Sequence, residues 1–277
     1  CIRDSLPIEL FDEINHQVPH LGNIFPSGAQ LTESFWFAGG IPMVQWMLRD
    51  MLDLDVMTVT GKTVGENLKE RNAHILDTDV IHTIDNAYSR EGGIAILRGS
   101  LAPDGAVVKQ SAVAPEMMVH EGPARVFDCE EDATEAILGG KIQAGDVVVI
   151  RYEGPKGGPG MREMYKAMKY LYGRGLAKTT ALITDGRFSG TNNGCFVGHI
   201  SPEAAEGGPI AIVHDGDLVE IDVDSKKLEL LVPQEEIEAR LKQWKRPEPK
   251  FKKGWLGLYC KLAASGSEGG VMKFDHL

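Results

Sequence analysis

The chain has 277 residues, 43% of them hydrophobic, and carries a formal net charge of −11. This length and apolar content suffice for a packed core and predict one large domain or two smaller ones. Nucleic acid and anionic membranes are poor partners for so acidic a chain, because both are negatively charged. No apolar run approaches the ~20 residues that cross a bilayer, so we expect neither a membrane nor a nucleic-acid partner.

Four cysteines are scattered along the chain, at Cys1, Cys129, Cys195 and Cys260. No two of them form a C-x-x-C pair, so the sequence does not indicate a self-contained zinc or iron–sulfur site. Their sparse spacing favours buried free thiols over a disulfide scaffold, and we expect a protein of the reducing cytoplasm. The chain opens without Met in a segment that reads as a helix, so we also expect a piece of a longer protein.

Residues 1–78 are predicted to be mostly helical, and one apolar stripe in residues 41–54 supports this: Met43, Trp46, Met47, Met51 and Leu54. The segment 58–63 resembles the end of a phosphate-binding loop. That loop needs glycine where Val56 stands, so a turn before a helix at 64–68 is the better interpretation.

From about residue 80, short β-rich runs alternate with turns, at 94–97, 147–152, 181–184, 210–213, 218–223 and 228–232. The last two runs flank a four-residue polar turn and predict a hairpin with one solvated face. Helices are expected at 130–138 with Asp128 as cap, after Ser201-Pro202, and at 234–244. The basic stretch 245–253 is interpreted as a solvated strap.

These patterns predict a mixed α/β fold, in which a helical N-terminal part precedes a β-barrel-like domain with helices around it. The strands are too irregular for strict βαβ alternation. We therefore expect the division near residue 80, with residues 1–79 helical and residues 80–277 forming the barrel-like domain.

The first segment with the composition of a site is the glycine-rich stretch 153–163, which follows a strand and precedes a helix with Met164, Met168 and Leu171 on its apolar face. A strand, a glycine-rich turn and a helix N-terminus form a natural cradle for an anion. Glu163 is predicted in the first turn of that helix, where its carboxylate suits a hard cation such as Mg²⁺. The alternative is that Glu163 only complements the helix dipole.

The second such segment is 183–194, a strand that ends in a polar loop with Ser189 as its one plausible nucleophile or base. A hydrolase nucleophile elbow is disfavoured, because Arg187 stands where the G-x-S-x-G frame needs glycine. Loops that follow neighbouring strands can meet at one end of a sheet, so we expect Ser189 and Glu163 to lie close together. The alternative is a serine that merely stabilises a turn.

Several long motifs, taken together, carry a family resemblance: GGPGMRE at 157–163, ITDGRFSG at 183–190 and GHISPEAAEGGPIAIVHDGD at 198–217. Shorter matches are AGGIP at 38–42, TGKTVGENL at 60–68 and LAPDGAVVK at 101–109. In this order, over nearly the whole chain, they closely resemble the dihydroxy-acid dehydratase / 6-phosphogluconate dehydratase family.

The resemblance implies a hydro-lyase that converts 2,3-dihydroxy acids into 2-keto acids with an iron–sulfur cluster, of the 2Fe-2S type, and Mg²⁺. The family motifs place a Mg²⁺ ligand at Glu163 and the base at Ser189, with Thr191 a weaker candidate for substrate contact. The cluster-binding cysteines belong to the family's N-terminal half, so no cysteine of this chain is assigned to the cluster.

The resemblance further implies that residues 1–79 are the remnant of the cluster-binding domain and that residues 80–277 form a swivelling barrel-like domain. Expected partners are a small dihydroxy acid, the protein's own N-terminal half and further copies in a homodimer or homotetramer. The leading substrates are the branched-chain dihydroxy acids of valine and isoleucine synthesis. Ser100 and the segment 191–193 depart from the branched-chain pattern, so a sugar-acid dehydratase stays open, as does a non-catalytic binding module or subunit.

Overall fold

The computed structural model describes residues 6–25, 28–71, 77–189 and 194–274. It divides into two compact units, one of Cys1–Asp12 with Ile94–Leu277 and one of Glu13–Gly93. Helix α1 (Ile8–Gln17) begins in the first unit and ends in the second. Nowhere in the described ranges is a helix both long and apolar enough to cross a membrane.

The unit of Glu13–Gly93 is helical, which confirms the prediction for the N-terminal region. Its further elements are α2 (Thr32–Phe37), α3 (Gly40–Met47), the 3-10 helix η2 (Arg49–Met51), α4 (Val64–Arg71) and the 3-10 helix η3 (Ile84–Asn86). The predicted stripe is only partly buried: Met43 lies in the core, whereas Met51 is exposed. The α-helix stops at Met47, and the tighter turn that follows no longer keeps the 3.6-residue period of the stripe.

The turn before α4 is a capping box. The Glu66 carboxylate accepts a hydrogen bond from the Thr63 N–H at 2.8 Å, and the Thr63 hydroxyl accepts one from the Glu66 N–H at 3.2 Å. This reciprocal pair satisfies two N–H groups at the start of the helix. The segment 58–63 is therefore a turn that leads into a helix, as expected.

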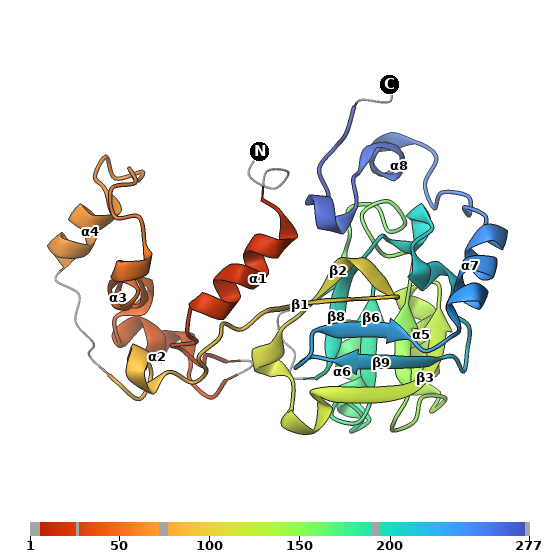
Figure 1. Cartoon of the computed structure of the whole chain (residues 1–277), viewed down its shortest axis with the longest axis horizontal. Coiled ribbons are helices and arrows are strands. Elements are labelled where there is room, and N and C mark those ends of the chain that lie inside the picture. The colour runs from red at the N-terminus through yellow and green to blue at the C-terminus, as the bar shows by residue number, and fades with distance from the viewer. Residues whose placement is uncertain (1–5, 26–27, 72–76, 190–193, 275–277) are drawn as a thin grey trace. The chain divides into compact units, whose positions relative to one another are not determined.

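The other unit is built on a closed barrel of eight strands (Figure 1), which confirms the predicted mixed α/β fold with a barrel-like sheet. The strands are β1 (Ala95–Gly99), β2 (Ala102–Val108), β3 (Val119–Phe127), β4 (Val147–Ile150), β6 (Ala181–Thr184), β8 (Phe196–Ser201), β9 (Leu218–Asp222) and β10 (Lys227–Leu230). Around the ring their order is β1-β10-β9-β3-β4-β6-β8-β2. From β3 through β4 and β6 to β8 the neighbours run parallel.

Further helices of this unit are α5 (Glu130–Leu138), α6 (Lys166–Gly173), α7 (Gln234–Gln243) and α8 (Gly254–Leu262). Short 3-10 helices lie between β2 and β3, namely η4 (Gln110–Ala112) and η5 (Pro115–Met117), and between β8 and β9, namely η6 (Ala204–Glu206) and η7 (Pro209–Ile212). A further one, η8 (Gly266–Glu268), follows α8. The hairpin predicted from residues 218–232 is confirmed, because β9 and β10 pair antiparallel with Leu228 opposite Ile221.

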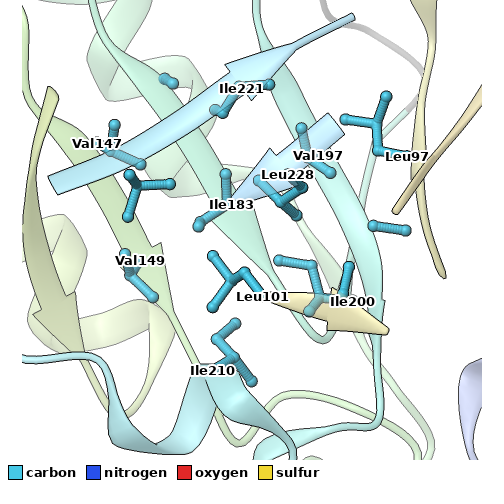
Figure 2. Packing of buried hydrophobic residues seen from close by; sticks show 14 of the residues in the cluster. Leu97, Leu101, Val147, Val149, Ile183, Val197, Ile200, Ile210, Ile221 and Leu228 are labelled. Carbon is cyan, nitrogen blue, oxygen red and sulfur yellow. The ribbon is translucent and has the colours of Figure 1, made fainter. Parts of the chain in front are cut away.

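Side chains from several strands fill the inside of the barrel (Figure 2), among them Leu97, Val147, Ile183 and Leu228. The neighbouring strands β4 and β6 are buried along their whole length. Alternate residues of these strands, such as Val148 and Leu182, belong to a second core with residues of α5 and α6. This double burial explains why both strands are continuously apolar and show no alternation.

Three local predictions are wrong. Residues 210–213 form no strand, since Pro209–Ile212 is a buried 3-10 helix. Ser201 does not start a helix; it ends β8, and Glu203 precedes only the short η6. Asp128 does not cap α5, because its carboxylate accepts a hydrogen bond from Arg151 Nε at 2.6 Å, and Cys129 occupies the cap position.

Candidate active site

Two polar segments leave the barrel at the same end. Strands β4 and β6 are parallel neighbours, with Val147 opposite Ala181 and Ile150 opposite Thr184. The glycine-rich segment 151–162 follows β4, and the segment that contains Ser189 follows β6. Because the carboxyl ends of parallel strands meet at one edge, the chain brings the two segments together there.

Beyond the barrel the two segments pair again in a small ribbon of β5 (Glu163–Met164) and β7 (Arg187–Phe188). The strands are parallel, with Glu163 opposite Arg187 and Met164 opposite Phe188. The Ser189 N–H extends this pairing by donating to the Met164 carbonyl oxygen at 3.2 Å. The predicted proximity of the Glu163 and Ser189 segments is thus present in the structure.

The ribbon has one buried face and one outer face. Met164 is fully buried, and Phe188 packs against the same core, whereas Glu163 and Arg187 are exposed. Side chains alternate along a strand, so Arg187 points away from the core on which Phe188 packs. Glu163 and Arg187 therefore share the outer face, whereas Ser189, which follows the second strand, is only 7% exposed.

The predicted helical position of Glu163 is wrong, because α6 begins at Lys166 and Glu163 lies on β5. A residue from another part of the chain provides the hydrogen-bond acceptor for the N–H groups at the start of α6. The buried Glu130 carboxylate accepts hydrogen bonds from the N–H groups of Lys166 at 2.9 Å and Ala167 at 3.3 Å. Glu163 is thereby left as an exposed carboxylate, and within the described ranges it forms no hydrogen bond or ion pair through its side chain.

Arg162, the residue before Glu163, donates hydrogen bonds to the carboxylates of two other residues. Its guanidinium donates to both oxygens of Glu131, at 2.6 Å each, and to Glu153 at 3.2 Å. The hydrogen bond from Arg162 lowers the pKa of Glu131 to about 2. A two-pronged contact of this kind fixes the direction of the chain immediately before Glu163.

Sequence reasoning missed a group of buried carboxylates beneath the two segments: Glu153, Asp185 and Glu203, each at most 2% exposed. Asp185 accepts hydrogen bonds from the N–H groups of Tyr152 at 3.1 Å, Glu153 at 3.0 Å and Ala204 at 2.8 Å. Burial raises the pKa of Asp185 to about 6 and that of Glu203 to about 7. The available signal was an acid directly after a buried strand, as in the ITDGR run.

The glycine after Asp185 is required by close packing. A Cβ on Gly186 would lie 2.9 Å from both Cβ and the carbonyl oxygen of Glu153. Only glycine leaves room for so close an approach of two chain segments. Gly186 therefore sets how near the Ser189 segment lies to the glycine-rich one.

Beside the ribbon lies an open hollow of about 830 Å³. Its walls include Ile96, Val107 and Met161, and among the described residues that line it Arg187 alone carries a formal charge. Arg187 Nε donates to the Met161 carbonyl oxygen at 2.6 Å. Burial, and then the charge of Arg187, lower the pKa of His199 in the same lining. The hollow suits a small anion with an apolar part.

The described residues offer an incomplete set of metal ligands. They contain no group of three His, Cys, Asp or Glu side chains placed to hold one ion. Glu163, exposed and without a side-chain partner among the residues that the structure describes, fits a single carboxylate ligand to a hard cation. Cys195 is buried with its pKa raised to about 12, and burial also raises the pKa of Cys129, so neither is poised as a thiolate. These cysteines do not fit an iron–sulfur cluster.

Comparison with known proteins defines the class. The model of the dihydroxy-acid/6-phosphogluconate dehydratase C-terminal domain matches residues 79–270, and that of the N-terminal domain matches residues 3–67. The chain belongs to this family.

Among curated relatives, the chain is 56% identical over 271 residues to a dihydroxy-acid dehydratase of Acetivibrio thermocellus, covering 97% of this chain and 49% of that protein. It is 55% identical to the dihydroxy-acid dehydratase of Caldanaerobacter subterraneus subsp. tengcongensis, covering 97% of this chain and 48% of that protein. The chain thus spans about half the length of these relatives.

Of the site residues expected from the sequence, Glu163 lies on β5 and Ser189 directly follows β7, with its N–H bonded to the Met164 carbonyl oxygen. Thr191 lies outside the described residues, as do Asn192 and Asn193.

Proposed function

We propose that this chain is the C-terminal half of a hydro-lyase that dehydrates 2,3-dihydroxy carboxylic acids to 2-keto acids. The observation that supports the proposal is the pairing of β5 with β7, which brings the segment of Glu163 beside the segment of Ser189 in a chain of this family. The curated relatives are named dihydroxy-acid dehydratase, which agrees with it.

In this proposal Ser189 is the base and Glu163 is a ligand of Mg²⁺. Bound Mg²⁺ would supply a positive charge that stabilises substrate oxygens and lowers the pKa of a nearby hydroxyl. The Ser189 Oγ, as the alkoxide, would take the proton from C2 of the substrate while the C3 hydroxyl leaves, and the resulting enol would tautomerise to the 2-keto acid. The pairing of the Ser189 backbone with Met164 would hold this oxygen beside the strand of Glu163. Arg187, on the same face as Glu163, would help to keep an anionic substrate in place.

The proposal assigns the iron–sulfur cluster to ligands outside this chain, because the cysteines described here do not fit it. Residues 1–79 would be the remnant of the N-terminal, cluster-binding domain, which the N-terminal match over residues 3–67 supports. The partners would be the protein's own N-terminal half, a small dihydroxy acid and further copies in a homodimer or homotetramer. Scattered free cysteines support the reducing cytosol as its compartment.

Branched-chain dihydroxy acids are the substrates we favour, since apolar walls line much of the hollow beside the ribbon. Ser100 is one of the residues that keep a sugar-acid substrate open in the sequence, but its hydroxyl has a structural role. Its hydroxyl accepts a hydrogen bond from the Leu230 N–H at 2.9 Å, which ties the turn after β1 to β10. Ser100 therefore gives no support to a polyhydroxylated substrate.

A keto-acid assay of the full-length enzyme tests the proposal. We expect rapid conversion of 2,3-dihydroxyisovalerate and slow conversion of a panel of aldonates and 6-phosphogluconate. A reversed preference would make the protein a sugar-acid dehydratase of the same family. Absence of keto acid from every substrate, with cluster and Mg²⁺ present, would favour the non-catalytic module and overturn the proposal.

A further inference from the structure

Glu203 is a buried side chain that contacts the glycine-rich segment through its backbone. It is 1% exposed and stands between β8 and η6. Its carboxylate accepts hydrogen bonds from the Lys156 N–H, at 2.9 and 3.2 Å to the two oxygens, and from the Gly157 N–H at 2.9 Å. Both donors belong to segment 151–162, which leads to Glu163.

The segment also wraps closely around this side chain. A Cβ on Gly154 would lie 2.6 Å from Glu203 Oε2 and 2.9 Å from Glu203 Cβ. No residue larger than glycine fits there without moving the segment or the carboxylate. The Glu203 side chain thus occupies the inside of the turn and defines its path.

Asp185 connects this turn to the segment of Ser189. Its Oδ2 accepts hydrogen bonds both from Tyr152, where segment 151–162 starts, and from Ala204, the residue after Glu203. Asp185 itself directly follows β6, four residues before Ser189. The two segments and the Glu203 turn therefore meet at one carboxylate.

We propose that Glu203 is a positioning residue, whose carboxylate fixes the path of segment 151–162 and thereby the place of Glu163 beside Ser189. Burying a carboxylate costs free energy, so it is a poor choice for stability alone, and here its contacts go to the backbone of one functional segment. The inference rests on the proposed function for the roles of Glu163 and Ser189. The hold on segment 151–162 stands independently of those roles.

The test uses the full-length enzyme with Glu203→Ala, Glu203→Asp and Glu203→Gln. Alanine removes the acceptor, and aspartate keeps the charge but is one methylene too short to reach the two N–H groups. Glutamine keeps one oxygen that can accept from both. As a matched control, Glu206→Gln breaks an ion pair with the side chain of the same Lys156, at 2.5 Å, and leaves its backbone contact intact.

Two readouts are needed besides turnover: hydrogen exchange of peptides that cover 154–163, and the affinity for Mn²⁺, a substitute for Mg²⁺, measured by electron paramagnetic resonance. We expect the alanine and aspartate variants to exchange this segment at least about tenfold faster and to bind Mn²⁺ about 10- to 100-fold more weakly. The glutamine variant and the Glu206→Gln control should stay close to wild type.

The inference is overturned if the aspartate variant keeps wild-type exchange and Mn²⁺ affinity, or if Glu206→Gln loosens the segment equally. If the alanine variant does not fold, the contrast between aspartate and glutamine still decides. A wild-type enzyme that neither binds Mn²⁺ nor forms keto acid would defeat the proposed function instead. The exchange data would then still support or reject the hold of Glu203 on the segment.

Discussion

The Ser189 N–H donates to the Met164 carbonyl oxygen at 3.2 Å, so the candidate base extends the short strand pairing that carries the candidate metal ligand Glu163. The distance between the two functional segments is thereby set by backbone hydrogen bonds. Backbone pairing is insensitive to most side-chain changes. The roles of Glu163 and Ser189 can therefore be tested by substitutions that leave this pairing in place.

Ser189→Ala should abolish turnover while leaving the fold and substrate binding nearly intact, because proton abstraction is a transition-state role. We expect kcat of the full-length enzyme to fall on the order of 10²–10⁴-fold or more. Keto-acid formation and exchange of the C2 hydrogen with solvent should fall together. Ser225→Ala, in the exposed hairpin turn, is the control. Retention of more than about a tenth of wild-type kcat would make Ser189 a turn residue.

Glu163→Gln should weaken the use of Mg²⁺ more than it weakens the fold. An amide fits the exposed position on β5, but it is a poorer ligand than a carboxylate for a hard cation. The concentration of Mg²⁺ needed for half-maximal activity should rise about tenfold or more. Glu121→Gln, at an exposed position on β3, controls for the loss of one negative charge. Wild-type activity at limiting Mg²⁺ would remove Glu163 from the metal site.

Glu131→Gln should have a small effect on stability and a larger one on Mg²⁺ affinity. The Arg162–Glu131 pair is well exposed, at 47% and 59%, so solvent screening limits its contribution to about 1 kcal/mol or less. Without this pair, the backbone just before Glu163 would no longer be fixed in one direction. Urea unfolding and Mg²⁺ titration measure the two effects. Glu135→Gln, one turn along α5, should change neither, and an equal loss of Mg²⁺ affinity in it would contradict the prediction.

Glu203 should make stability depend on pH. Burial raises its folded pKa to about 7 from an ordinary 4.5, so the folded protein binds a proton that the unfolded chain has already released. The free energy of unfolding must therefore fall as pH rises from about 4.5 to 7, by about 3 kcal/mol for this group. Asp185, with a pKa of about 6, acts in the same direction.

The side chain at position 203 cannot titrate in the Glu203→Gln variant. The free energy of unfolding of this variant should therefore lack the part of the decline with pH that Glu203 causes. Urea unfolding of wild type and variant at pH 4.5, 5.5, 6.5 and 7.5 measures the difference, which should grow in favour of the variant as pH rises. Two parallel curves would show that the Glu203 carboxyl titrates normally.

The isolated 277-residue chain should be colourless and inactive after treatment with iron and sulfide, because its described cysteines are scattered and form no group of ligands for a cluster. A visible absorption spectrum checks this. A cluster band at one equivalent per chain would refute the assignment of the ligands to another part of the protein.

An element could be predicted from the sequence where its pattern of apolar residues fits only one type of secondary structure. The run 181–184 became β6, and the alternation in 218–223 became the hairpin strand β9. Residues 210–213 are as apolar as a buried strand, but Pro209 at the first position starts a 3-10 turn instead. An apolar run of four residues does not by itself distinguish the two.

At the site, the motifs located Glu163 and Ser189 but not the supports beneath them. The sequence predicts a helix start that is too early, because Glu163 stands just before an apolar pattern of helical period. The carboxylate that accepts hydrogen bonds from the start of α6 belongs to Glu130, 36 residues away from Lys166. Asp185 and Glu203 read as ordinary loop acids, since only the folded chain brings backbone N–H groups to them. Long-range contacts of this kind leave no periodic signal in a single sequence.

The ring of eight barrel strands has a consequence for assembly. Every one of these strands has a neighbour on both sides, so the barrel offers no unpaired strand to which another chain could add its own. Copies of this unit cannot join by extending the barrel sheet from one molecule to the next. Any oligomer that this unit helps to build must be held by surfaces other than the barrel sheet, such as the helices, the connecting segments or the β5/β7 ribbon.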